Sequence, residues 1–148
     1  MSTRPAEQMP VKIKVKTDIR DGHSKDTFEL IAFGRYYIKE NARFLQYEEA
    51  MEEGMAKTII KVSDKEGLIM RSGAVRMRLP FIMNKKLKGS YHTPYGVFEI
   101  ETMTKRLDHQ FNEQTGNGSI DLLYELKMQG ASSGTYHLSI TFEEEEES

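Results

Sequence analysis

Apolar and polar residues alternate strictly along most of this chain, and this alternation constrains the fold more than any other feature. In the first such run, Val11, Ile13 and Val15 alternate with three lysines. Successive side chains of a β-strand point to opposite faces, so this pattern predicts a half-buried strand. Later runs with the same period cover residues 28–38, 58–62, 120–128 and 136–142. A shift of one residue would turn each apolar row towards water, so the strand register is well specified.

Turn-forming residues separate these runs. Gly or Asn supplies the positive φ that hairpin turns need within segments 20–22, 39–41, 64–67, 72–74, 115–118 and 130–134. Counting the runs between turns predicts about eight to ten strands in up-and-down succession. With 148 residues, the chain has room for one domain. We therefore expect an all-β fold, a single antiparallel meander β-barrel, in preference to a sandwich, because closure removes exposed strand edges.

Two places depart from the simple pattern. Phe44, Tyr47 and Met51 are spaced like one face of a helix, although Phe44 and Gln46 also fit a strand. We expect the first half of segment 41–53 to be a strand. Pro80 interrupts another alternating run and cannot donate a ladder hydrogen bond, so we expect a bulge or a short edge there.

Charge is unevenly distributed despite a formal net charge of -2. We expect one barrel domain over residues 1–148, with a flexible N-terminus at 1–9 and a solvated acidic tail at 143–148. The stretch from Gly67 to Phe98 contains no Asp or Glu. Its basic residues form a candidate anion patch: Arg76, Arg78, Lys85, Lys86 and Lys88.

Composition narrows the class of protein. The chain has no cysteine, which excludes disulfides, thiol catalysis and Cys-based metal sites. No apolar run approaches the roughly 20 residues of a transmembrane helix, and the first ten residues lack the apolar core of a secretory signal. We therefore expect a soluble cytoplasmic protein without membrane association.

Residues typical of catalysis are scarce. The histidines His23, His92, His109 and His137 lack metal-site spacing, and we expect each to be an ordinary surface or loop residue. Carboxylates that share a strand face oppose the apolar residues, so we expect them to face solvent: Glu99 with Glu101, and Asp121 with Glu125. The sequence predicts no catalytic residue, metal site or cofactor, and leans against an enzyme.

Segment 90–96 is the most distinctive local sequence. It combines a Thr-Pro-Tyr-Gly turn with the hydroxyl groups of Tyr91, Thr93 and Tyr95. One interpretation is a rigid hairpin that caps the barrel, and the other is the mouth of a binding site. The candidate ligand-binding residues are Arg71, Tyr91, Thr93, Tyr95 and Tyr124. The direction of Arg71 stays open, because Leu68 and Met70 compete with Ile69 for the inward face.

A set of motifs is spread over nearly the whole chain: Tyr47-Glu48-Glu49, Arg71-x-Gly73, Met77, Phe81, Tyr91-x-Thr93-Pro94-Tyr95-Gly96, Thr102 and Gly118-x-Ile120-x-Leu122-x-Tyr124-x-Leu126. In their order and spacing these motifs resemble the YwiB-like family of small bacterial proteins with a calycin-type β-barrel. The resemblance implies the barrel and a bacterial, cytoplasmic setting. It implies no activity and no functional residues, and the run of five glutamates lies outside the shared pattern.

Three hypotheses for function follow. The first is a barrel that binds a small apolar or anionic ligand, since barrels of about eight strands are wide enough for one. The second is a homo-oligomeric interaction protein with a filled lumen. The third is weak binding of RNA or other anions through the basic 67–98 segment, although the acidic net charge makes nucleic acid an unfavoured partner.

Overall fold

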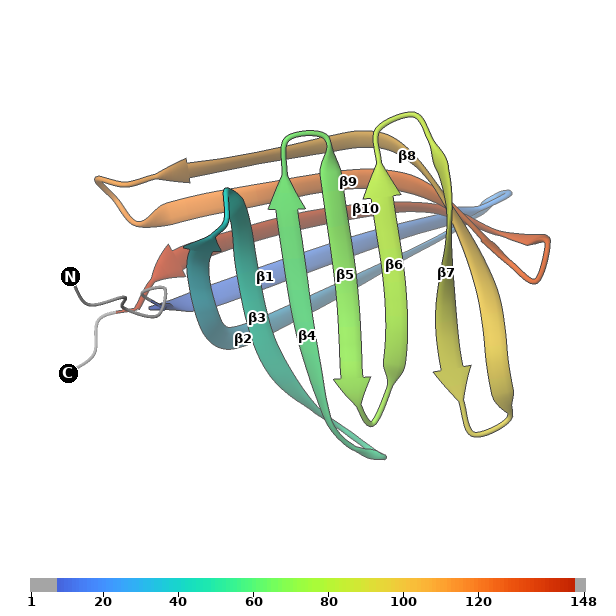
Figure 1. The fold of residues 1–148 in the computed structure, drawn as a ribbon. Coiled ribbons are helices and arrows are strands. Elements are labelled where there is room, and N and C mark those ends of the chain that lie inside the picture. The colour runs from blue at the N-terminus through green and yellow to red at the C-terminus, as the bar shows by residue number, and fades with distance from the viewer. Residues whose placement is uncertain (1–7, 146–148) are drawn as a thin grey trace.

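Ten antiparallel strands, each paired with the next along the chain, make up the computed structural model, which describes residues 8–145. They are β1 (Met9–Asp21), β2 (Ser24–Lys39), β3 (Ala42–Met51), β4 (Gly54–Ser63), β5 (Glu66–Gly73), β6 (Arg76–Ile82), β7 (Lys86–Thr93), β8 (Gly96–Asn112), β9 (Asn117–Met128) and β10 (Ala131–Glu144). Pairing of β1 with β10 closes the barrel (Figure 1). The predicted all-β meander is confirmed. Among the described residues, no helix is long and apolar enough to cross a membrane.

The alternating rows point into the barrel as predicted. Val11, Ile13 and Val15 of β1 are buried, as are most inward residues of β9 and the last two inward apolar residues of β10, Ile140 and Phe142. Tyr36 stacks against Phe111 and Phe142 with ring centroids 4.6 and 4.8 Å away. These rings fill the lumen near the end that holds the β8–β9 turn. The apolar core is therefore continuous with an aromatic plug at that end.

Alternation predicts on which face of a strand a side chain lies, but not how deeply that side chain is buried. Phe28 and Ile38 have the inward parity of β2, yet their exposed fractions are 58% and 47%. Both lie close to the ends of the strand, where β2 extends beyond the packed core. The core is thus shorter than the rows of alternating residues.

Strands β2 and β3 pair over only part of their length. β2 pairs with β1 from Ser24 to Tyr36, but with β3 only from Gly34 to Lys39. At Gly34 a Cβ atom would lie 2.0 Å from the carbonyl oxygen of Gln46, so the close approach requires glycine. Beyond this point β2 continues beside β1, whereas β3 follows β4 in a different direction (Figure 1). The barrel wall therefore has a side gap between segments 24–33 and 48–51.

A second interruption of the ladder surrounds Pro80. β6 pairs with β7 only from Arg76 to Arg78, and the Pro80 carbonyl instead accepts a hydrogen bond of 2.6 Å from the Thr102 hydroxyl. The expected short edge at this proline is therefore present, because the missing N–H falls where the β6–β7 ladder has ended. The strand interpretation of segment 41–53 is also correct and extends further than expected, since β3 continues to Met51.

The boundaries of both terminal segments need correction. Met9 already belongs to β1, and Glu143 and Glu144 belong to β10. These acidic residues are held by backbone pairing: Glu143 lies opposite Lys12, and the Glu144 N–H donates to Gly116 O at 3.0 Å. Glu145 also donates its N–H to Pro10 O. The acidic run thus begins within the barrel. The expectations for residues 1–7 and 146–148 lie outside the described residues.

Two threonines on the inward face of β8 form a matched pair for measuring the cost of a buried hydroxyl. Thr102 and Thr104 are both fully buried, but only the Thr102 hydroxyl has a hydrogen-bond partner among the described residues. We expect Thr104→Val to raise the free energy of unfolding by about 1 kcal/mol, because it removes an unpaired buried polar atom. We expect Thr102→Val to lower it by about 1 kcal/mol, because the Pro80 carbonyl loses its donor. Urea unfolding of both variants measures these changes, and equal destabilisation by both would contradict this account.

Candidate ligand-binding cavity

The gap between β2 and β3 opens into a cavity of about 430 Å³. This volume falls in the range of about 300–1,000 Å³ that is typical of small-molecule sites. Most of the lining surface is apolar, and the apolar lining residues come from six strands: Val15, Phe28, Leu30, Ile60, Ile69, Met77, Leu79 and Leu138. The polar lining residues are Thr17, Glu29, Tyr47, Glu49, Thr58, Arg71, Tyr124 and Tyr136. The lumen is therefore plugged at one end and hollow towards the other.

A polar row crosses three adjacent strands at the wall of this cavity. Strand register places Tyr47 of β3 opposite Thr58 of β4, and Thr58 opposite Arg71 of β5. Arg71 Nε donates a hydrogen bond of 3.2 Å to Thr58 Oγ1, and Arg71 Nη2 donates one of 2.5 Å to Glu49 Oε1. Arg71 shares the inward parity of Ile69, which settles its direction: the guanidinium group lines the cavity.

Tyrosine hydroxyl groups line the same cavity. The rings of Tyr124 and Tyr136 stack with centroids 5.4 Å apart, and Tyr124 also contacts Phe81. Burial strongly raises the pKa of Tyr124 and also raises that of Tyr136. Burial raises the pKa of Tyr47 too, against the opposing effect of its hydrogen bond with Thr58. All three phenols are therefore protonated at neutral pH, so they can hydrogen-bond a ligand but cannot act as general bases.

Two of the five candidate ligand-binding residues lie at the cavity, namely Arg71 and Tyr124. Tyr91 packs against the core, in register with Met77, but does not line the cavity. The Thr93 hydroxyl accepts a hydrogen bond from the Tyr95 N–H and donates to Gly96 O, so it serves the turn itself. The Tyr95 side chain is 94% exposed. The structure thus favours the interpretation of segment 90–96 as a rigid hairpin.

The candidate anion patch lies on the outer surface. Arg76 and Arg78 are exposed on β6, Lys85 in the β6–β7 turn, and Lys86 and Lys88 on β7. Lys88 Nζ lies 3.3 Å from an oxygen of Glu99, so one of the five charges is already paired. Arg78 borders a smaller hollow of about 210 Å³ where β6 and β7 separate. Anion binding by this patch stays a prediction.

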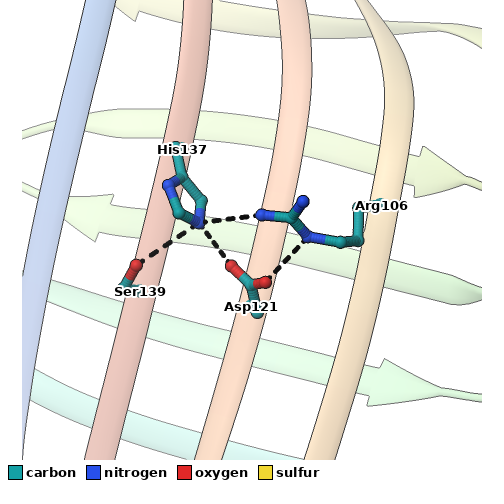
Figure 2. Close-up of polar contacts among 4 residues, drawn as sticks. All are labelled: Arg106, Asp121, His137 and Ser139. Carbon is teal, nitrogen blue, oxygen red and sulfur yellow. Dashed lines mark hydrogen bonds and ion pairs between the residues drawn. The ribbon is translucent and has the colours of Figure 1, made fainter.

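The outer face of β8, β9 and β10 carries a separate polar cluster, formed by Arg106, Asp121, His137 and Ser139 (Figure 2). The Asp121 carboxylate contacts Arg106 Nε at 2.8 Å and His137 Nε2 at 2.5 Å. Burial tends to raise the pKa of Asp121, but hydrogen bonds from His137 and Arg106 outweigh it, so the pKa is lowered. The register shift between Thr104 and Arg106 in β8 brings Arg106 to this outer face.

This cluster does not have the geometry of a Ser-His-Asp triad. A triad needs its serine and its carboxylate on different nitrogens of the histidine. Here Asp121, Arg106 and Ser139 all approach the same atom, His137 Nε2. The cluster instead links three neighbouring strands across the outer surface, which is a structural role.

We expect Asp121→Asn to lower the free energy of unfolding at neutral pH by about 1 kcal/mol, a value limited by solvent screening because the carboxylate is 37% exposed. Since the folded pKa is lowered, this stabilisation is present above the unfolded value of 3.8 and is lost as the pH falls through the folded pKa. Urea unfolding as a function of pH measures the difference. Glu125→Gln is the control, because its exposed pair with Lys105 at 3.7 Å should contribute less. A difference that persists unchanged below pH 3.8 would contradict the assignment.

The cavity is indicated in the sequence by polar residues at inward positions of the alternating rows, not by composition or by a motif. Tyr47, Thr58 and Arg71 each continue an apolar row of inward parity at the position where a further apolar residue is expected. Polar residues at inward positions of neighbouring strands indicate a hydrated or liganded lumen. Glu49 continues the row of Tyr47 in the same way.

Together these features define an antiparallel β-barrel with one plugged end and a side cavity of mixed polarity. The chain belongs to the family described as domain of unknown function DUF1934, which matches residues 13–140. It is 32% identical over 137 residues to a protein of Bacillus subtilis (strain 168) described as "Uncharacterized beta-barrel protein YwiB". That alignment covers 93% of this chain and 95% of the relative.

The fold agrees with a solved structure of the same family. The crystal structure of ywiB protein from Bacillus subtilis matches with a TM-score of 0.84 and 30% sequence identity. The match covers 95% of this chain and 96% of that chain. The expected resemblance to the YwiB-like family is confirmed, and the relative's description assigns no activity.

Proposed function

We propose that this protein binds a small amphipathic molecule in the cavity between β2 and β3 without transforming it. The supporting observation is the polar row from Tyr47 to Arg71 within a cavity that is otherwise mainly apolar. Apolar walls with a few convergent polar groups are typical of small-molecule sites, because the walls provide affinity and the polar groups fix orientation. The protonated tyrosines provide hydrogen bonds but no base, which favours binding over catalysis.

The barrel architecture supports the same function. Lipocalin-like and streptavidin-like barrels hold one small ligand in the lumen, and a ten-stranded barrel has at least comparable width. We therefore propose that the lumen of this barrel holds its ligand as the lumen of a calycin does. We also propose a bacterial, cytoplasmic setting, supported by the relative from Bacillus subtilis and by the absence of cysteine.

A mutation that fills the cavity tests this function. We expect a neutral apolar dye such as N-phenylnaphthylamine to bind with increased fluorescence, and Leu30→Trp to weaken binding by about tenfold by occupying the space beside β2. Val97→Trp is the matched control, since Val97 is exposed on β8 and does not line the cavity. Circular dichroism verifies that both variants keep the fold. Absence of dye binding, or equal binding by both variants, would contradict a ligand site in this cavity.

A second candidate function, self-association, is favoured by one observation on β2. Ile31 and Phe33 are large exposed apolar residues on its outer face, and segment 24–33 has no pairing with β3. Exposed apolar side chains beside an unpaired strand edge favour association with another chain. We expect a dimer by light scattering that Phe33→Lys converts to a monomer. A wild-type monomer at high concentration would exclude this function.

A further inference from the structure

The cavity lining carries no net positive charge despite the presence of Arg71. Of the charged residues that line it with inward parity within the described residues, Glu49 is negative and Arg71 is positive. Glu29 borders the cavity too, but it has the outward parity of β2 and lies opposite Lys16. The Arg71 and Glu49 side chains are only 21% and 26% exposed. Charge interactions at such partly buried positions are screened less by salt than those at the open surface. The pair therefore offers no unpaired positive charge to attract a negative ligand group.

Two of the three guanidinium nitrogens of Arg71 already have partners. Its Nη2 atom lies 2.5 Å from Glu49 Oε1 and 3.9 Å from the sulfur of Met51, and its Nε atom donates to Thr58. A ligand carboxylate that used this guanidinium would have to displace Glu49 or lie beside it. Displacement would leave a partly buried carboxylate without its cation, and close approach would place two negative charges together.

A neutral polar group meets neither obstacle, and a cationic group can use the remaining acceptor sites of Glu49. A carboxylate has about four acceptor sites, so Glu49 can accept a hydrogen bond from a ligand while it keeps its bond with Arg71. Tyr136 and Thr17 also line the cavity, and their hydroxyl groups can donate a hydrogen bond to an uncharged polar group or accept one from it.

From this geometry we infer that the cavity selects amines and neutral amphiphiles and discriminates against carboxylates. The inference rests on the proposed ligand-binding function and names the chemical class of its ligand. It departs from the anionic alternative of the first hypothesis, because Glu49 neutralises the Arg71 guanidinium from within the same cavity. Glu49 is thus the specificity-determining residue.

Three probes with the same alkyl chain test the selectivity on the full chain. Calorimetric titration with octylamine, octanol and octanoate at neutral pH and equal ionic strength compares a cation, a neutral group and an anion. We expect octylamine to bind most tightly and octanoate about tenfold or more weakly than octylamine, with the difference decreasing as salt is added. Octanoate binding as tight as octylamine would overturn the inference while leaving the proposed function in place.

Substitution of Glu49 gives a sharper readout because it should reverse the order. In Glu49→Gln the Arg71 guanidinium loses its counter-ion, and we expect octanoate affinity to rise about tenfold while octylamine affinity falls. Glu48→Gln is the matched control, since this neighbouring glutamate is exposed on the opposite face of β3 and should change neither. Unchanged selectivity in Glu49→Gln would overturn the inference. Failure of all three probes to bind both wild type and Glu49→Gln would count against the proposed function itself.

Discussion

Pairing between the first and last strands is the constraint on which the rest of this structure depends. The β1–β10 ladder runs from Val11 opposite Glu144 to Arg20 opposite Thr135. It joins segments more than a hundred residues apart, so its closure carries an entropic cost that the shared core must offset. Closure converts ten amphipathic strands into one continuous wall and gives every inward row a common core. Glu143 and Glu144 pair with Lys12 and Val11, and the Glu145 N–H donates to Pro10 O, so the ladder continues into the acidic run.

Unequal strand lengths then determine where the wall is incomplete. β2 and β8 have 16 and 17 residues, whereas β6 has 7. A long strand cannot keep both neighbours along its full length when one neighbour turns away, and β2 leaves β3 at Gly34. The cavity is the result of that divergence at one end, while the Tyr36, Phe111 and Phe142 rings fill the other. Binding capacity in this barrel thus follows from a local departure from regular pairing.

Local sequence patterns predict the strands and their faces, whereas the contacts between residues of different strands depend on the register of the barrel. Strand positions, turns, the inward rows and the exposed direction of Arg76 and Arg78 follow from residue order, because a strand has a period of two. The site was only partly predictable. Arg71 and Tyr124 were among the expected residues, but Glu49 and Thr58 were not, since their proximity to Arg71 depends on the register of β3, β4 and β5. The turn residues Thr93 and Tyr95 looked equally suitable, because hydroxyl content says nothing about distance from a cavity.

By itself, the sequence determined an all-β meander, the face on which each alternating residue lies, and the absence of any thiol chemistry. Those properties depend on side-chain period and composition, which are local. Only the tertiary structure decided that the wall opens between β2 and β3, that Arg71 faces inward and is paired with Glu49, and that Asp121 joins Arg106 and His137 outside the barrel. These properties depend on which residues of different strands stand side by side, and that register is established only when the whole barrel closes.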